Sequence, residues 1–169
     1  MKAIDLSEIL PEKTSRGDDI LSDIYDEEIN VNYTRKRGRP VPYMINRYVG
    51  REKFLVGITI WACEGTRRRP HELEISNSSD DLANMYMSPL RELGIDKYAR
   101  FRVQAIEDDV ESCELFWEKC LKIKKKGKPI THIRKIRENS NGIVNIRINS
   151  TILRELFVYW ANNLPSFLQ

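Results

Sequence analysis

The stretch that most constrains this chain of 169 residues is an apolar segment that ends in an acid and a glycine. From Arg51 to Ala62 the large apolar side chains recur at helical spacing, and Gly65 stands where such a helix would end. The residues before this glycine are Cys63 and Glu64. The helix dipole disfavours a carboxylate at this end of a helix unless the carboxylate faces a cation. Glu64 is therefore either a ligand for a cation or an exposed helix end.

Hydrophobic periodicity and capping residues predict alternating strands and helices after this segment. The expected strands are Glu72–Ile75, Arg100–Ala105, Ile130–Ile136 and Ile143–Ile148, and the expected helices are Ser79–Leu93, Asp109–Ile123 and Ser150–Asn163. We expect Pro89 to kink the first of these helices and Gly94 to end it. Asn141-Gly142 predicts that the last two strands form a hairpin. Antiparallel strands with helices on one side indicate an α+β fold.

The first part of the chain differs from the rest in composition. Residues 1–32 are acidic, and we expect either a short helix around Asp19–Tyr25 or a loosely held arm. Residues 33–44 contain two prolines and a glycine, so they are expected to be extended or turning. The expected division is an N-terminal arm at residues 1–44 and an α+β domain at residues 45–169.

The distribution of charge says more about a partner than the net charge of +3 does. Three runs are basic, at residues 35–39, 67–69 and 122–137. Clustered cations separated by foldable sequence are typical of a surface that binds phosphates. The alternative is that these clusters are solvated surface.

Several kinds of protein are excluded or disfavoured by what the sequence lacks. The cysteines Cys63, Cys113 and Cys120 are too few and too scattered for a disulfide framework or a four-ligand zinc site, so we expect reduced thiols. His71 and His132 have no Cys or His at ligand spacing. The sequence contains no phosphate loop, Gly-x-Ser-x-Gly or His-Glu-x-x-His motif. No apolar run approaches 18 residues, from which we expect an intracellular protein, cytoplasmic or nucleoid-associated, with no membrane partner.

Five segments in order resemble the LAGLIDADG homing endonucleases, in a degenerate form with one motif per chain. They are Gly57–Thr66, Glu74–Asp80, Phe116-Trp117, Gly142–Arg147 and Leu153–Trp160. The resemblance runs from about Phe54 to Trp160. It implies a curved antiparallel β-sheet with helices packed on one face.

The resemblance also implies a homodimer, because the motif helix of one copy packs against that of the other in this family. The two acids at the helix ends then hold divalent metal, Mg²⁺, over the scissile phosphates of double-stranded DNA. Glu64 is the position onto which this catalytic and metal-binding role carries over. Three functions stay open: a metal-dependent endonuclease that cleaves phosphodiester bonds, a DNA-binding transcriptional regulator on the same fold with cleavage lost, and an RNA-binding splicing factor.

The residues expected to contact DNA fall into three groups. Arg37-Gly38-Arg39-Pro40 resembles the core of an AT-hook, which enters a narrow minor groove, although a basic linker would look similar. Basic and amide side chains on the strands are able to read bases in a major groove. The predicted DNA-binding residues are Arg37, Gly38, Arg39 and Pro40, then Arg67, Arg68 and Arg69, and on the sheet Arg100, Arg102, Gln104, His132, Arg134, Asn145 and Arg147.

Overall fold

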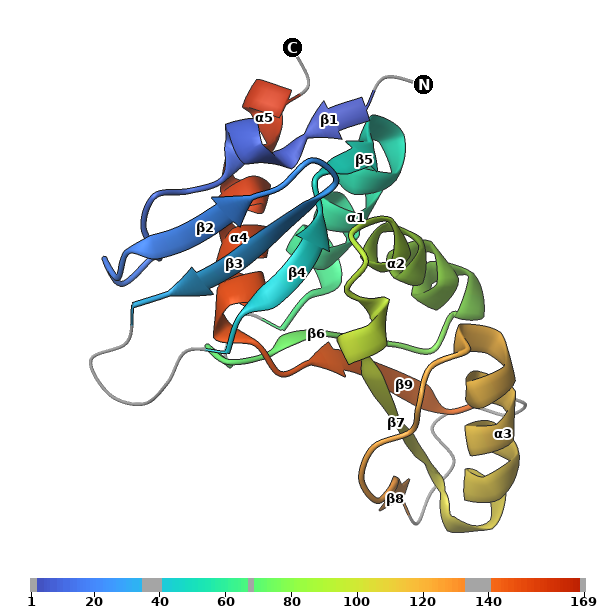
Figure 1. Ribbon diagram of the computed structural model, residues 1–169. Helices are drawn as coiled ribbons and strands as arrows, with labels where there is room; N and C mark the ends of the chain where they lie inside the picture. Colours follow the sequence, from blue (N-terminus) through green and yellow to red (C-terminus); the bar gives the residue numbers. More distant parts are fainter. Residues whose placement is uncertain (1–2, 35–40, 67–68, 133–140, 168–169) are drawn as a thin grey trace.

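The computed structural model describes residues 3–34, 41–66, 69–132 and 141–167 (Figure 1). Its largest sheet has four strands in the order β6-β9-β7-β8. These strands are β6 (Leu73–Asn77), β7 (Arg100–Ile106), β8 (Ile130–His132) and β9 (Ile143–Ile148). The long helices are α1 (Arg51–Glu64), α2 (Asp80–Glu92), α3 (Val110–Leu121) and α4 (Thr151–Asn162). In Figure 1, α1, α2 and α4 lie above this sheet and α3 lies beside β7. The predicted α+β class is confirmed.

The order of strands differs from the hairpin that the sequence predicts. The strand β9 pairs in antiparallel fashion with both β6 and β7, whereas β8 pairs in parallel with the outer edge of β7. The hairpin between β8 and β9 is therefore wrong for the described residues. In the observed order Ile146 lies opposite Ile75 on one side and Phe101 on the other, and all three side chains are buried. Burial in a central strand thus outweighs the local turn signal.

Gly142, which suggested the hairpin turn, has another role. Its φ is +70°, and a Cβ at this position would lie 2.5 Å from the carbonyl oxygen of Gln104. A glycine is needed here because the chain approaches the backbone of β7 closely as β9 begins. The glycine therefore marks a close contact between strands as well as a left-handed turn.

The N-terminal part of the chain forms two small sheets. One pairs β1 (Ala3–Asp5) with β5 (Tyr48–Gly50), and a 3-10 helix, η1 (Leu6–Ile9), follows β1. The other has the order β2-β3-β4, with β2 (Ile20–Ile24), β3 (Glu28–Tyr33) and β4 (Tyr43–Asn46). The helix predicted around Asp19–Tyr25 is wrong, because these residues pair along β3 as a strand.

Residues 3–33 belong to the same hydrophobic core as the rest of the fold. Leu6, Ile29 and Val31 are fully buried in it. The indole Nε1 of Trp160 donates to the carbonyl oxygen of Ile9 at 3.0 Å, which ties η1 to α4. The N-terminal residues are therefore packed on α4 and not held as a loose arm, while the domain boundary at residue 44 stays a prediction.

The helix α1 is held between two others. Phe54 packs edge to face against Trp160 of α4 with ring centroids 5.1 Å apart, and Trp61 does so against Phe157 of α4 at 5.8 Å. On the side of α2, Gly57 lies so close to Pro89 that an added Cβ would stand 2.2 Å from the proline Cγ. The small residue is thus used for close packing inside one chain.

The ends of the helices follow the expected capping chemistry. The Ser79 hydroxyl accepts from the Leu82 amide at 3.3 Å at the start of α2, and Gly94, with a φ of +68°, follows its end. Pro89 lies within this helix. The remaining short helices are η2 (Asp96–Tyr98), η3 (Glu107–Asp109) and α5 (Leu164–Phe167). Among the described helices, none has the length and apolar character needed to cross a membrane.

Substituting Gly57→Ala tests the contact between α1 and α2. Alanine favours a helix by about 1 kcal/mol over glycine, so an uncrowded site would gain stability. Because the new methyl group meets Pro89, we expect the free energy of unfolding to fall by about 1–3 kcal/mol in a urea titration. Glu52→Ala, at the exposed start of the same helix, is the control and should shift the free energy of unfolding by less than about 1 kcal/mol. A Gly57→Ala protein more stable than the wild type would contradict this packing.

Candidate nucleic-acid interface

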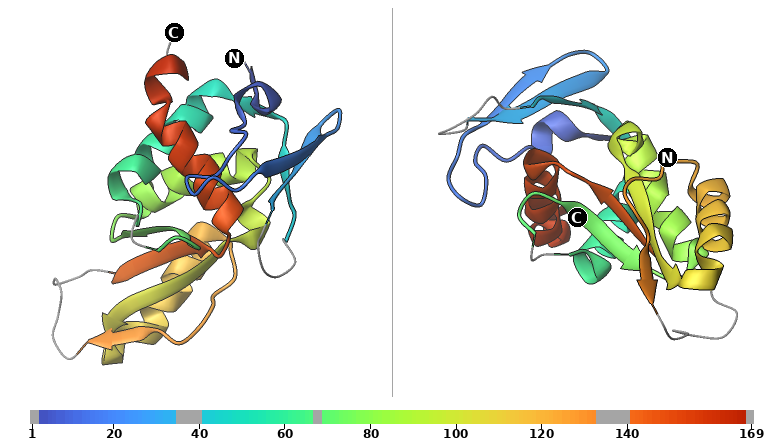
Figure 2. Two further views of the ribbon diagram at one scale, coloured as in Figure 1. Left: turned by 90° about the vertical axis from the view of Figure 1, so that its left-hand side faces the viewer. Right: turned by 90° about the horizontal axis from the view of Figure 1, so that it is seen from below.

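One face of the four-stranded sheet carries polar side chains and has no described helix in front of it. Figure 2 (right) shows this face from below, with β6, β9 and β7 toward the viewer. Along β7, Phe101, Val103 and Ala105 are buried toward the helices, while the alternate residues point the other way and are half-buried. The strand predicted at Arg100–Ala105 is confirmed, and its burial alternates as expected for a strand with one buried face.

The register brings the predicted sheet residues of two strands onto this face. Arg100 lies opposite Arg147, and Arg102 lies opposite Asn145. Gln104 follows on the same side of β7. These five residues, which are far apart in sequence, therefore form one surface, which we call the open face. On β6 its neighbours are Glu74 and Ser76, which lie opposite Arg147 and Asn145.

A chain of hydrogen bonds crosses the open face over three strands. The amide Nε2 of Gln104 donates to Asn145 Oδ1 at 2.8 Å, and Asn145 Nδ2 donates to the hydroxyl of Ser76. Asn145 is buried, with 4% of its surface exposed. Because both ends of its amide are engaged, Asn145 positions Gln104 and is not itself free to read a base. The amide oxygen of Gln104 forms no hydrogen bond within this chain of contacts.

The arginines of the open face differ in what surrounds them. Arg100 Nη1 donates to the carbonyl oxygens of Lys97 at 2.9 Å and Ala99 at 2.6 Å, which fixes its guanidinium. The Nε of Arg102 is buried and has no hydrogen-bond partner among the described residues. An unsatisfied buried donor of this kind is costly to the folded protein.

Two glutamates that the sequence did not single out stand at the β6 edge of the open face. Arg69 Nη1 donates to Glu72 Oε2 at 2.9 Å and lies 3.4 Å from Glu74 Oε2. Arg147 Nη1 lies 3.9 Å from Glu72 Oε1. These contacts partly neutralise Arg69 and Arg147, two of the predicted DNA-binding residues. The alternation of Glu72-Leu73-Glu74-Ile75 already placed both acids on the polar side of a strand.

The two glutamates respond differently to this environment. Burial and the neighbouring Glu72 raise the pKa of Glu74 above its ordinary value of 4.5. Partial burial also opposes ionisation of Glu72, but the hydrogen bond from Arg69 and the charge of Arg147 outweigh it and hold the Glu72 pKa below the same value. One acid is therefore stabilised as a carboxylate while the other is penalised for its charge.

Glu64, the candidate catalytic and metal-binding residue, is the last residue of α1 and is exposed. No ion pair of Glu64 is found within the described part of the chain. The chain after it returns to the sheet at once, because the Thr66 amide donates to the Glu74 carbonyl at 2.9 Å. Glu64 therefore lies near the β6 edge of the sheet.

The metal hypothesis rests on Glu64 as the one acid that the sequence assigns to it. Within residues 3–34, 41–66, 69–132 and 141–167, no three His, Cys, Asp or Glu side chains gather where they could hold a metal ion. Mg²⁺ is commonly bound by one or two carboxylates together with water and substrate phosphates. Glu64 alone fits such a role only when a second acid or a phosphate completes the site.

The helix that carries Glu64 is ended by a glycine for a steric reason. Gly65 has a φ of −71°, so it is not a left-handed stop. A Cβ there would lie 2.3 Å from the Trp61 carbonyl oxygen and 2.6 Å from its indole Nε1. The glycine at position 65 thus follows from its close approach to the buried Trp61.

Some predicted site residues cannot be placed. The AT-hook-like residues Arg37, Gly38, Arg39 and Pro40, and also Arg67, Arg68 and Arg134, lie outside the described residues. The backbone of His132 lies in β8 opposite Ile106. His71 Nδ1 lies 2.8 Å from the hydroxyl of Thr151.

Comparisons with known proteins add no family to this picture. No protein-family model matches the chain, and neither curated proteins nor solved structures gave a match.

Removing the charge of Glu74 and removing the charge of Glu72 should change the stability of the fold in opposite directions. Well below pH 4.5, Glu74 is protonated in both the folded and the unfolded protein. As the pH rises through the raised pKa of Glu74, the folded protein must hold a buried negative charge. Glu74→Gln should therefore raise the melting temperature at pH 7, and the gain should vanish below about pH 4.5. Glu72, with a lowered pKa, stabilises the fold as a carboxylate. Glu72→Gln should lower the melting temperature at pH 7, and the loss should fade as acid protonates Glu72.

Each variant is the control for the other in a series of thermal melts from pH 3 to pH 8. Shifts of the same sign at pH 7 would contradict the assignment of a favoured and a penalised carboxylate.

Proposed function

We propose that this protein binds double-stranded DNA through the open face of its four-stranded sheet. The observation that carries the proposal is the register of β7 and β9, which gathers Arg100, Arg102, Gln104 and Arg147 on one side. Arginine suits guanine and glutamine suits adenine in the major groove, so the face combines cations with groups that discriminate bases. The resemblance to LAGLIDADG homing endonucleases supports the same surface, because it implies a sheet that lies on DNA.

The proposal predicts that Gln104 reads a base and that the cations supply affinity. A fluorescence-anisotropy titration with a randomised duplex library should give an affinity that falls steeply with salt. The slope of log affinity against log salt concentration should be about −0.9 for each phosphate contact. Gln104→Ala should leave this slope unchanged and relax the base preference recovered by selection at one position, at a cost of about 1–3 kcal/mol for the preferred base.

Lys119→Gln, which removes an exposed cation from α3, is the control for an unspecific charge effect. A nearly flat salt dependence of the wild type would show that these cations are only solvated surface, and it would overturn the proposal.

The proposal includes a homodimer that forms through α1. A close crossing of two such helices would use their small residues, but Gly57 of α1 already packs against Pro89 of the same chain. The exposed residues of α1 include Val56, Thr59 and Cys63, which recur at helical spacing on one side. A second copy would pack on this stripe and would bring a second Glu64 to the same edge of the sheet.

Metal-dependent cleavage is the more specific form of the proposal. Bound Mg²⁺ would polarise the scissile phosphate and help to form the attacking hydroxide. In this chain Glu64 would hold the ion, and the cations of the open face would hold the DNA over it. The exposure of Glu64 in a single chain favours the alternative, a transcriptional regulator on the same fold that binds DNA without cutting it. An RNA-binding splicing factor is a third form, since the open face would also contact RNA.

Glu64→Gln separates the nuclease from the regulator. Purified protein is incubated with a randomised plasmid library and Mg²⁺, and cleavage is scored on a gel while binding is measured in chelator. If Glu64 holds the metal, the substitution should abolish cleavage and leave affinity unchanged, since the amide is a poor ligand of the same shape. Glu52→Gln, at the exposed start of the same helix, should change neither. Cleavage that persists in Glu64→Gln would remove Glu64 from the mechanism, and no cleavage by the wild type would favour the regulator.

A further inference from the structure

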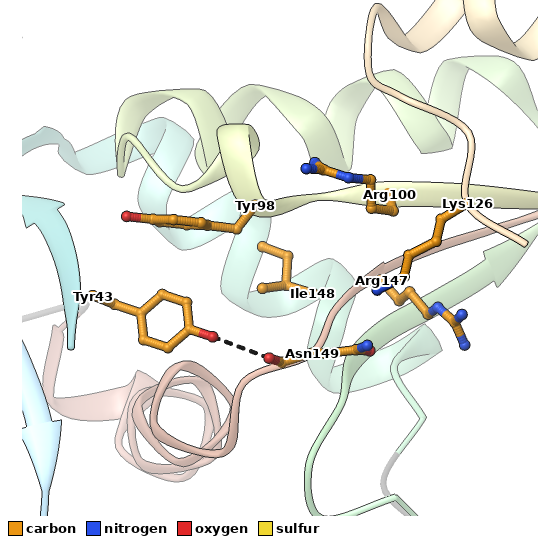
Figure 3. Close-up of a pocket in the computed structure, with 7 residues that line it drawn as sticks. All are labelled: Tyr43, Tyr98, Arg100, Lys126, Arg147, Ile148 and Asn149. Carbon is orange, nitrogen blue, oxygen red and sulfur yellow. Dashed lines mark hydrogen bonds between the residues drawn. The ribbon is translucent and has the colours of Figure 1, made fainter. Parts of the chain in front are cut away.

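A pocket of about 210 Å³ lies at the end of the open face, where the N-terminal sheet meets the four-stranded sheet. It is lined by seven residues from β4, η2, β7, β9 and the loops beside them, which are drawn in Figure 3: Tyr43, Tyr98, Arg100, Lys126, Arg147, Ile148 and Asn149. Three of the seven are cations and none is an acid. The pocket therefore gathers positive charge in a hollow at the Arg100 end of β7.

The two arginines of this pocket are a like-charge pair within the sheet. Arg100 and Arg147 are direct partners in the register of β7 and β9 and lie on the same face. Directly opposed like charges on neighbouring strands destabilise a sheet. Glu72 offsets this only in part, since its nearest approach to Arg147 is 3.9 Å. An anion between the two arginines would remove the repulsion.

The third cation is brought in by a loop that is fixed to the sheet. The Lys126 amide donates to the Phe101 carbonyl at 2.9 Å, and the Phe101 amide donates to the Lys124 carbonyl at 3.3 Å. These bonds hold residues 124–126 along the edge of β7. The exposed Lys126 side chain thus starts from a fixed backbone position beside Arg100 (Figure 3).

The wall opposite the cations is fixed as well. The Tyr43 hydroxyl donates to the Asn149 carbonyl at 3.0 Å, which joins β4 to the end of β9. Tyr43 and Tyr98 pack edge to face with ring centroids 5.0 Å apart. Arg100 is held by the carbonyls of Lys97 and Ala99. Groups held in place before binding lose little freedom when a ligand arrives.

We propose that this pocket binds a phosphate group. Three cations in the lining of a space of this size, with no acid beside them in the lining, suit an oxyanion that accepts hydrogen bonds from several donors at once. Arginine supplies the planar donor pairs that suit phosphate, and Lys126 supplies a point charge. Resting on the proposed function, the group is a backbone phosphate of the bound duplex, and the pocket sets the position of the strand on the open face.

The pocket is tested first with inorganic phosphate alone. Amide resonances of the full chain are followed by NMR as phosphate is added, with sodium chloride at equal ionic strength as the reference. Saturable shifts at Arg100, Lys126 and Asn149 are expected in the wild type and should weaken by about tenfold in affinity in Lys126→Gln. Lys128→Gln, at an exposed position of the same loop that does not line the pocket, should behave as the wild type. No saturable shift, or equal shifts in Lys126→Gln, would overturn the pocket.

A second measurement uses the randomised duplex library. If the pocket holds a backbone phosphate, Lys126→Gln should weaken binding for all sequences alike and reduce the salt slope by about 0.9, while the Lys128→Gln slope stays at the wild-type value. An unchanged slope in Lys126→Gln with duplex binding intact would overturn the backbone contact and leave the proposed function standing. Phosphate shifts without any duplex binding would refute the proposed function and support the pocket as a phosphate site.

Discussion

The contact between α1 and α4 is the interaction on which the other parts of the fold depend. The edge-to-face pairs Phe54–Trp160 and Trp61–Phe157 join the two helices, and all four rings are buried. Such pairs add about 0.5–1.5 kcal/mol each beyond the burial of their surface. The small N-terminal sheet packs on one side of α4, and the four-stranded sheet lies below (Figure 1). Loss of this contact would therefore weaken the packing that holds together the two sheets on either side of the proposed phosphate pocket.

The hydrophobic period and the capping residues made most of the fold predictable from the sequence. The predictions that were wrong have a common physical cause. The alternation from Arg100 to Ala105 placed each side chain of β7 on its observed face, because a one-residue slip would have exposed its apolar set. The partners of a strand depend on burial across the whole core, which a local pattern does not contain. The turn signal at Gly142 thus predicted a hairpin, and the acidic composition before Glu28 concealed strands β1 and β2.

The candidate site shows the same difference between features that a local sequence pattern determines and features that depend on the pairing of distant strands. Residue types and alternation were enough to predict that Gln104 and Asn145 belong to a polar surface. They could not show that the Asn145 amide is already engaged in hydrogen bonds with Gln104 and Ser76, because these bonds depend on the register of three strands. Nor could they show that Arg69 and Arg147 face Glu72, which reduces the charge that these arginines offer to a phosphate.

The residues proposed to position a duplex and the residue proposed to read a base are separated on this sheet. Phosphate contacts fix the register of a protein on DNA, and base contacts give the specificity. Gln104, held by the network of β6 and β9, lies toward one end of the open face, while Arg100 and Arg147 reach the pocket at the other end. Tyr43 comes from the N-terminal sheet and forms a wall of that pocket. The N-terminal part of the chain therefore contributes to the proposed placement of the DNA strand through its contact with β9, and its role extends beyond completing the core.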